Sequence, residues 1–154
     1  MRAWRAAYRG LLPDEVLDGL SVEDRERSWR ELLSDPDGRS FTLVAAGGEP
    51  GVEGFCAVAV PSRDHDADAL TAEVAATYVA PGRWRTGIGS ALLRTALEEL
   101  RSGGWREVTL WVFAENDRAR SFYAKFGFEA DGAERRHKWS GRQIEMRLRA
   151  GLAR

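Results

Sequence analysis

One stretch, residues 73–93, constrains the fold of this chain more than any other. It reads as a β-strand that runs into a glycine-containing turn and then into an amphipathic helix. The first turn of a helix has four backbone N–H groups without partners and carries about half a positive charge. Gly87 and Gly89 lack a Cβ, so an anion could approach those N–H groups closely. The segment predicts a phosphate-binding turn, although an ordinary strand–helix connection has the same local pattern.

The spacing of the glycines distinguishes between phosphate loops. No Lys-Ser/Thr follows the second glycine, as a Walker loop requires, and Leu92 stands where a dinucleotide fingerprint needs its third glycine. The segment resembles the acetyl-CoA loop of the GCN5-related N-acetyltransferases (GNAT), (Gln/Arg)-x-x-Gly-x-(Gly/Ala), which follows a strand ending in Tyr-Val-x-Pro, here residues 78–81. Trp84 stands at the Gln/Arg position. The departure matters little if backbone N–H groups grip the phosphate.

A second segment, residues 116–128, resembles the other signature of that family, Asn-x-x-Ala-x-x-Phe-Tyr-x-x-x-Gly-Phe. Asn116 is placed to cap a helix, and Gly127 is placed to end it in a left-handed conformation. Periodicity alone would make Tyr123 a core aromatic, because it shares an apolar stripe with Ala119, Phe122 and Phe126. Two signatures in the right order, with a strand between them, favour a functional role instead.

Length and composition set further bounds. A chain of 154 residues suits one domain over 1–154, and 44% hydrophobic with 31% charged residues is typical of a soluble globular protein. A net charge of −1 gives no electrostatic reason for a nucleic-acid or membrane partner. A single cysteine excludes an internal disulfide, and with two histidines it cannot form a conventional zinc site, so we expect no metal. We expect Cys56 to be a buried small hydrophobe. With no signal peptide or membrane span, the cytoplasm is the expected location.

The order of predicted elements matches the fold of the same family. We expect helices within 1–34, with Trp4, Ala7, Tyr8 and Leu11 on one face, a short helix from Pro13 to about Leu20, and a helix capped by Ser21 that runs to Leu33. Further helices are expected over 87–101 and from 116, and strands over 41–46, 52–60, 70–79, 107–113, 128–137 and 142–149.

The resemblance implies an α/β (α+β) fold whose central sheet is mixed, largely antiparallel and twisted. That sheet would splay apart at the acetyl-CoA site and be flanked by helices. The family usually begins with a strand that is missing here, so either the strand is absent or the true start lies upstream of Met1.

The resemblance also assigns roles. Asn116 would bind the pantetheine arm of acetyl-CoA together with the backbone of Thr77, Tyr78 and Val79, and the pyrophosphate would lie on Arg85, Thr86, Gly87, Ile88, Gly89 and Ser90. Tyr123 would protonate the leaving thiolate, since a phenol of pKa about 10 remains protonated beside a thiol of about 8.5. Arg120 and Lys125 would reach the 3′-phosphate, or they are simply solvated.

Glu73 is the candidate general base. An alkyl amine has a pKa of roughly 10.4 and must lose a proton to attack. Strict alternation would place Glu73, Ala75 and Thr77 on one face, with room beside the carboxylate for a substrate. A solvated carboxylate at a strand start is the alternative. In other branches of the family a Glu lies on the next strand, where this chain has Trp111.

The acceptor is not named by the sequence. An acceptor pocket could be lined by Trp4, Tyr8, Trp29, His137, Trp139 or the acidic loop 64–68, which would suit a cationic acceptor or form a solvated cluster. We expect an acetyl-CoA-dependent N-acetyltransferase acting on a primary amine of a small molecule or peptide. The alternative is a non-catalytic acyl-CoA-binding module of the same fold. The expected partners are acetyl-CoA and the amine, and a homodimer is compatible with this interpretation.

Overall fold

A single six-stranded sheet organises the computed structural model, which describes residues 8–19, 21–35, 37–47, 51–137 and 142–153. The strand order is β1-β2-β3-β4-β6-β5. The strands are β1 (Phe41–Gly47), β2 (Gly51–Ala59), β3 (Thr71–Val79), β4 (Glu107–Phe113), β5 (Glu129–Arg136) and β6 (Ile144–Gly151). Neighbours are antiparallel except β3 and β4, which run parallel. The predicted mixed, largely antiparallel sheet is confirmed.

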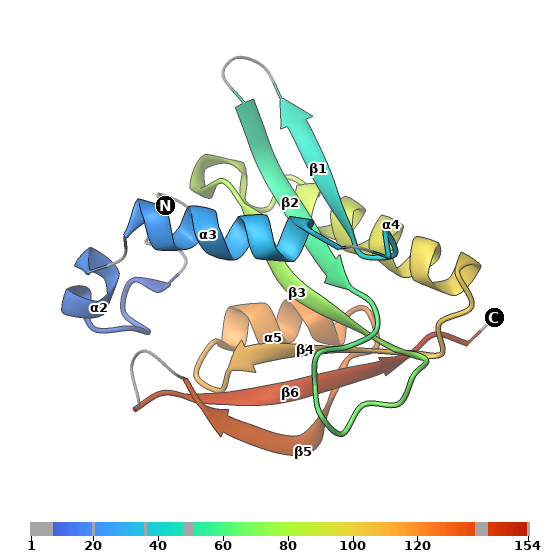
Figure 1. Cartoon of the computed structure of the whole chain (residues 1–154). Helices are drawn as coiled ribbons and strands as arrows, with labels where there is room; N and C mark the ends of the chain where they lie inside the picture. Colours follow the sequence, from blue (N-terminus) through green and yellow to red (C-terminus); the bar gives the residue numbers. More distant parts are fainter. Residues whose placement is uncertain (1–7, 20, 36, 48–50, 138–141, 154) are drawn as a thin grey trace.

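Helices cover both faces of this sheet (Figure 1). The helix α3 (Val22–Leu33) crosses one face over β1 and β2, near the short helix α2 (Asp14–Asp18). The helices α4 (Ile88–Ser102) and α5 (Asp117–Ala124) lie on the other face, and the 3-10 turn η1 (Pro81–Arg83) leads from β3 towards α4. None of the helices in the described ranges is long and apolar enough to cross a membrane.

Local sequence signals account for most helix ends. The Ser21 hydroxyl accepts a hydrogen bond from the Asp24 backbone N–H at 3.1 Å, and Asn116 Oδ1 accepts one from Ala119 N–H at 3.1 Å. Gly127 adopts the left-handed φ of 83° expected after α5. The N-terminal prediction is wrong at Leu11, because Gly10 at φ 85° turns the chain out of helical geometry.

Other N-terminal expectations fall partly outside the description. The short helix ends at Asp18, and the predicted end at Leu20 lies outside the described residues, as do Trp4 and Ala7. The same holds for a strand before Tyr8.

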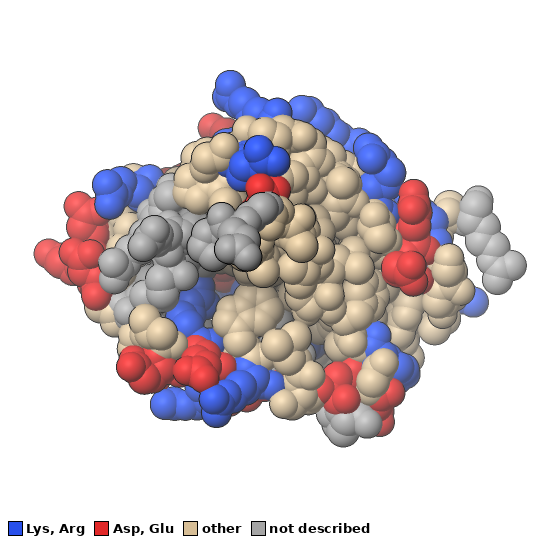
Figure 2. Space-filling view, turned by 90° about the horizontal axis from the view of Figure 1, so that it is seen from above, with Lys and Arg blue, Asp and Glu red and all other residues tan. Residues whose placement is uncertain are grey.

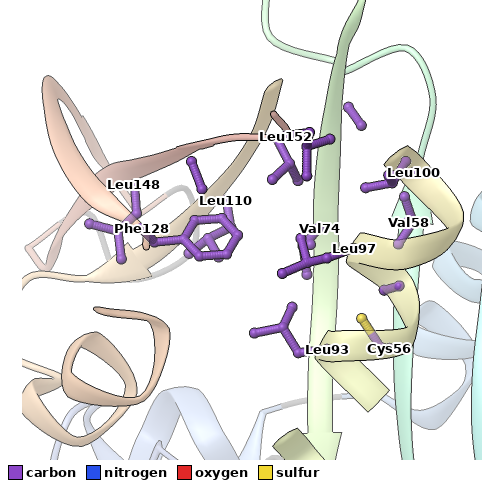
Figure 3. Packing of buried hydrophobic residues seen from close by; sticks show 14 of the residues in the cluster. Cys56, Val58, Val74, Leu93, Leu97, Leu100, Leu110, Phe128, Leu148 and Leu152 are labelled. Carbon is purple, nitrogen blue, oxygen red and sulfur yellow. The ribbon is translucent and has the colours of Figure 1, made fainter. Parts of the chain in front are cut away.

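The core lies between the sheet and the helices α4 and α5. Figure 3 shows leucines of α4 packing towards β2 and β3, with Leu110 and Leu148 on the neighbouring strands and Phe128, just before β5, beside them. Cys56 is fully buried there, and burial raises the pKa of its thiol to about 11. The prediction that Cys56 is a buried small side chain is confirmed.

A β-bulge at Ala75 changes which residues of β3 share a face. Val74 pairs with Val58 of β2, but Ala76 already pairs with the adjacent Ala57, so Ala75 is an extra residue without a partner of its own. The extra residue shifts the alternation of the side chains that follow it.

As a consequence, Thr77 faces the same side of the sheet as Val74, towards α4 and α5. Its partner Cys56 belongs to that core, and the Thr77 hydroxyl donates to Cys56 Sγ at 3.5 Å. Glu73 instead shares the opposite face with Tyr78. The prediction that Glu73 and Thr77 share a face is therefore wrong, because strict alternation ignores the bulge.

The strands β3 and β4 separate after Glu73, just before the bulge. Their parallel pairing covers only three positions and ends at Glu73 and Thr109. From there Val74–Val79 and Leu110–Phe113 diverge, as Figure 1 shows. Backbone groups along this part of β3 therefore face β4 without a ladder between them, which opens a passage through the sheet.

Candidate active site

A cavity of about 1170 Å³ occupies the gap between the diverging strands β3 and β4. One end is lined by the turn before α4 and the start of α5, and the other by Glu73, Trp111, Phe113 and His137. Figure 2, which looks down on the molecule from the top of Figure 1, shows a hollow with blue Lys or Arg atoms at depth and charges of both signs around it. The cavity thus connects the two faces of the sheet.

The turn that precedes α4 is shaped as an anion site. Gly87 is the N-cap of α4 with a φ of 89°, and Arg85 also adopts a left-handed φ of 61°, which is uncommon for a residue with a Cβ. The first turn of α4 carries no acidic side chain. The unpaired N–H groups at the positive end of α4 therefore lie along a wall of the cavity.

Trp84 ties this turn to β3. Its indole N–H donates to the carbonyl of Val79 at 2.9 Å, and the guanidinium of Arg118 lies 4.0 Å from the centre of its ring. The residue that departs from the family pattern thus fixes the turn and positions a cation at the α4 end of the cavity. Sequence reasoning missed Arg118, whose only signal is its place in the first turn of α5.

Tyr123 and Asn116 reach the cavity from α5. Tyr123 packs against Phe122 and Phe128 with ring centres at 5.2 and 5.7 Å. Burial raises the pKa of its phenol well above the usual value, with the Thr77 side chain acting in the opposite direction. The phenol therefore stays protonated at neutral pH. Because Asn116 uses Oδ1 to cap α5, its amide nitrogen is the atom that would meet a ligand.

Glu73 lies at the other end, and only 4% of it is exposed. Its carboxylate accepts three hydrogen bonds from Arg63: from the backbone N–H at 3.1 Å, from Nε at 3.0 Å and from Nη2 at 2.6 Å. The alternative of a solvated carboxylate is therefore wrong. The ion pair raises the pKa of Arg63, which stays charged. Sequence reasoning missed Arg63, which belongs to the loop after β2.

The acidic loop 64–68, which directly follows Arg63, is bound to the sheet. The guanidinium of Arg147, which is 5% exposed, contacts Asp66 at 2.6 and 2.8 Å, Asp64 at 3.3 Å and Asp131 at 2.7 Å. These hydrogen bonds to Arg147 lower the pKa of Asp66 to about 2. Asp64 also accepts from the Trp111 indole at 2.9 Å. The loop carboxylates are not among the residues that line the cavity. Of the two alternatives for this loop, the one in which it lines an acceptor pocket is therefore wrong. The solvated cluster is also inaccurate for Asp64, whose side chain is only 11% exposed.

Aromatic side chains form a wall at the Glu73 end. The ring of Tyr8 meets Tyr78 edge-on at 6.4 Å and Phe113 at 5.2 Å, and Phe113 meets His137 at 4.9 Å. The predicted pocket residues Tyr8 and His137 therefore line the cavity. Trp29 instead packs on Phe55 at 4.7 Å, beside a separate groove. Trp4 and Trp139 lie outside the described residues.

The cavity brings together most of the predicted site residues. In addition to Tyr123 and Glu73, it is lined by Thr77, Tyr78, Val79, Arg85, Gly87, Gly89, Ser90 and Asn116. Two predicted residues lie outside its lining: Thr86, whose hydroxyl donates to the Arg83 carbonyl at 2.6 Å, and Ile88, which packs against the core.

Of the two cations considered for the 3′-phosphate, only Lys125 lies at the cavity. Lys125 lines the cavity, whereas Arg120 donates to the Ala114 carbonyl at 3.0 Å.

Comparison of the sequence with known proteins identifies the family of this chain. The chain matches the acetyltransferase (GNAT) family over residues 3–128, and it belongs to that family. It is 32% identical over 133 residues to a probable N-acetyltransferase of Mycobacterium tuberculosis, covering 84% of this chain and 70% of that protein. It is 33% identical over 127 residues to a mycothiol acetyltransferase of Thermobispora bispora, covering 82% of this chain but only 42% of that longer protein. The chain is thus an enzyme of the N-acetyltransferase class.

Solved structures agree with the fold. The PaiA N-acetyltransferase of Thermoplasma acidophilum, solved in complex with coenzyme A, superimposes with a TM-score of 0.71 at 21% identity over 97% of this chain and 86% of that one. The ribosomal-protein-S18-alanine N-acetyltransferase of Escherichia coli gives a TM-score of 0.67 at 22% identity over 84% and 77% of the two chains. The predicted GNAT fold is confirmed.

Proposed function

We propose that the protein transfers an acetyl group from acetyl-CoA directly to a primary amine of a small molecule or peptide. The observation that carries this proposal is the cavity between β3 and β4, which joins the turn before α4 to Tyr123 and Glu73. A phosphate-binding turn at one end and an acid–base pair beyond it are what a thioester-to-amine transfer requires. The relative solved with coenzyme A supports the choice of donor.

Acetyl-CoA would enter from the α4 and α5 side. Its pyrophosphate would meet the N–H groups of residues 85–90, with Arg118 and Lys125 nearby as cations. The pantetheine arm would run along Thr77–Val79, pairing with the backbone groups that β4 leaves unpaired, and would meet the Asn116 amide. Trp84 already occupies the Val79 carbonyl, which limits that pairing to the stretch before it.

The chemistry balances with the side chains present. The amine nitrogen attacks the thioester carbon and forms the C–N bond, and the C–S bond breaks. The nitrogen loses a proton to Glu73, directly or through a water, and the sulfur gains one from the Tyr123 phenol. Because Glu73 and Thr77 face opposite sides of β3, the acceptor would approach from the α3 side and acetyl-CoA from the α5 side. The two substrates would meet in the gap.

A thiol-release assay with acetyl-CoA and a panel of amines, run beside a thermal shift with CoA alone, tests the proposal. We expect CoA to raise the melting temperature and at least one amine to release free thiol. Stabilisation by CoA without release on any amine would instead support the acyl-CoA-binding module. If CoA fails to raise the melting temperature and no amine releases thiol, the assignment of the cavity is contradicted.

A further inference from the structure

The acceptor end of the cavity carries more positive than negative side chains. Among the described residues that line it, the charged groups at this end are three arginines and two glutamates: Arg25, Arg63, Arg135, Glu73 and Glu145. Each glutamate is already paired with an arginine, because Arg63 Nη2 lies 2.6 Å from Glu73 and Arg135 Nε lies 2.7 Å from Glu145. The formal charge of the described lining residues at this end is thus positive, and neither glutamate is left without a cation.

The carboxylates that could reverse this charge point elsewhere. Asp64 and Asp66 bind Arg147, and Asp68 accepts from the Leu70 N–H at 2.7 Å and from the Thr71 hydroxyl at 3.0 Å. A polycationic acceptor would thus meet the guanidinium groups of Arg63 and Arg135 without the loop carboxylates to attract it. The charge pattern disfavours that class of amine.

Arg63 presents a second edge of its guanidinium. The planar group carries five N–H donors in a fixed fork, and Glu73 engages the edge made by Nε and Nη2. Planarity places Nη1 on the far side from Glu73, and 58% of the Arg63 side chain is exposed. An acidic group is the partner that such an edge binds most strongly.

The remaining wall at this end is aromatic. Tyr8, Tyr78 and Phe113 are in edge-on or close contact, and Trp111 lies under Arg135, with the guanidinium 4.1 Å from the centre of its ring. Burial raises the pKa of both tyrosines, so neither contributes a charge near neutral pH. These surfaces suit an uncharged, apolar or aromatic body.

We propose that the acceptor is an amine that bears a carboxylate or similar acidic group a few bonds from the nitrogen, on an uncharged apolar or aromatic body. Arg63 binds the acidic group, and Glu73 faces the amine. Because Arg63 and Glu73 are in direct contact, the two groups of the ligand must be close together, as in an α-amino acid. This inference rests on the proposed acetyl transfer and specifies its acceptor.

Matched acceptors test the inference. Thiol release is measured with phenylalanine and phenylalanine amide, and with tryptophan and tryptophan amide, and kcat/KM is expressed per neutral amine. The amides remove the negative charge and also lower the pKa of the amine, and expressing kcat/KM per neutral amine corrects for that second change. We expect the wild type to prefer each acid by about tenfold or more, the scale of one charge-assisted contact. Preference for the amides, or for a diamine such as putrescine, would overturn the inference while leaving acetyl transfer intact.

The variant Arg63→Lys tests whether Arg63 causes the preference for the acids over the amides. Arg63→Lys keeps a positive charge beside Glu73 but lacks the second edge of donors. We expect its acid-to-amide ratio to fall to near one, while the KM for acetyl-CoA is unchanged. Arg94→Lys, on the exposed side of α4, is the matched control and should keep the wild-type ratio. An unchanged ratio in Arg63→Lys overturns the role of Arg63, and no release with any amine overturns both this inference and the proposed function.

Discussion

The carboxylate of Glu73 is held along one edge of the Arg63 guanidinium, with Nη2 at 2.6 Å from Oε1 and Nε at 3.0 Å from Oε2. The pair lies at the point where the β3–β4 pairing ends. It therefore stands at the proposed acceptor side of the cavity, and it fixes the orientation of the proposed base.

Glu73→Gln keeps the size of the side chain and removes the base. We expect kcat to fall most at low pH, where few amine molecules are already neutral, and to recover partly as the pH rises. The measurement is a pH–rate profile with the best acceptor, beside a thermal melt that checks folding. A profile with the same shape and height as the wild type would mean that the amine loses its proton to water without Glu73.

Tyr123→Phe removes the proposed proton donor and keeps the aromatic packing. We expect the variant to fold and bind acetyl-CoA but to lose about 10²-fold or more in turnover, the scale of general acid catalysis. Because burial raises the pKa of the phenol, the wild type should keep this donor through mildly alkaline pH. Steady-state kinetics beside calorimetry with CoA makes the test. Full turnover in the variant would leave Tyr123 as a packing residue only.

Arg147→Met breaks the network that fastens the loop after β2. The change leaves Asp64, which is 11% exposed, without its buried cation, and leaves Asp131, which is 13% exposed, with Arg149 alone. We expect a loss of about 3–5 kcal/mol in the free energy of unfolding, the range for a broken buried ion pair. Urea denaturation measures it. The control Arg27→Met removes the exposed pair with Asp24 and should cost about 1 kcal/mol or less. Equal losses in the two variants would contradict the role of Arg147.

Asp66 makes part of this stability depend on pH. Its pKa is lowered to about 2 in the folded state, against about 3.9 for an unperturbed Asp. The lowered pKa means that its contribution is fully present above the unfolded value and is lost as the pH falls towards the folded one. We expect the melting temperatures of wild type and Asp66→Asn to differ at pH 7 and to converge between about pH 4 and pH 2. A gap of constant size across that range would contradict the assigned ion pair.

Much of the fold could be predicted because its signals are local. Ser21, Asn116 and Gly127 set helix ends through bonds and dihedral angles within a few residues. The strands alternate over short windows, and β4 occupies the predicted residues 107–113. The two family signatures also placed Gly87 and Tyr123 on one cavity.

The rest depends on partners far apart in the chain. The bulge at Ala75 is defined only against β2, so alternation within β3 could not reveal that Glu73 and Thr77 face opposite sides. Arg147 is 81 residues from Asp66, and no local pattern indicates that pairing. From the sequence, the acidic loop therefore resembled a possible ligand site. In the structure it is part of an internal ion-pair network. The role of Arg63 could not be predicted either, because its partner Glu73 is ten residues away on another element.

The most direct test of the central claim is the binding of CoA to the turn before α4, measured by calorimetry. Gly87→Asp places a carboxylate at the N-cap of that helix. Gly104→Asp makes the same change at the other end, where Gly104 has a similar φ of 81° and is exposed, so it controls for backbone strain. We expect the wild type and Gly104→Asp to bind CoA alike and Gly87→Asp to lose about tenfold or more in affinity, through repulsion of the pyrophosphate. Equal affinity in all three proteins would contradict the assignment.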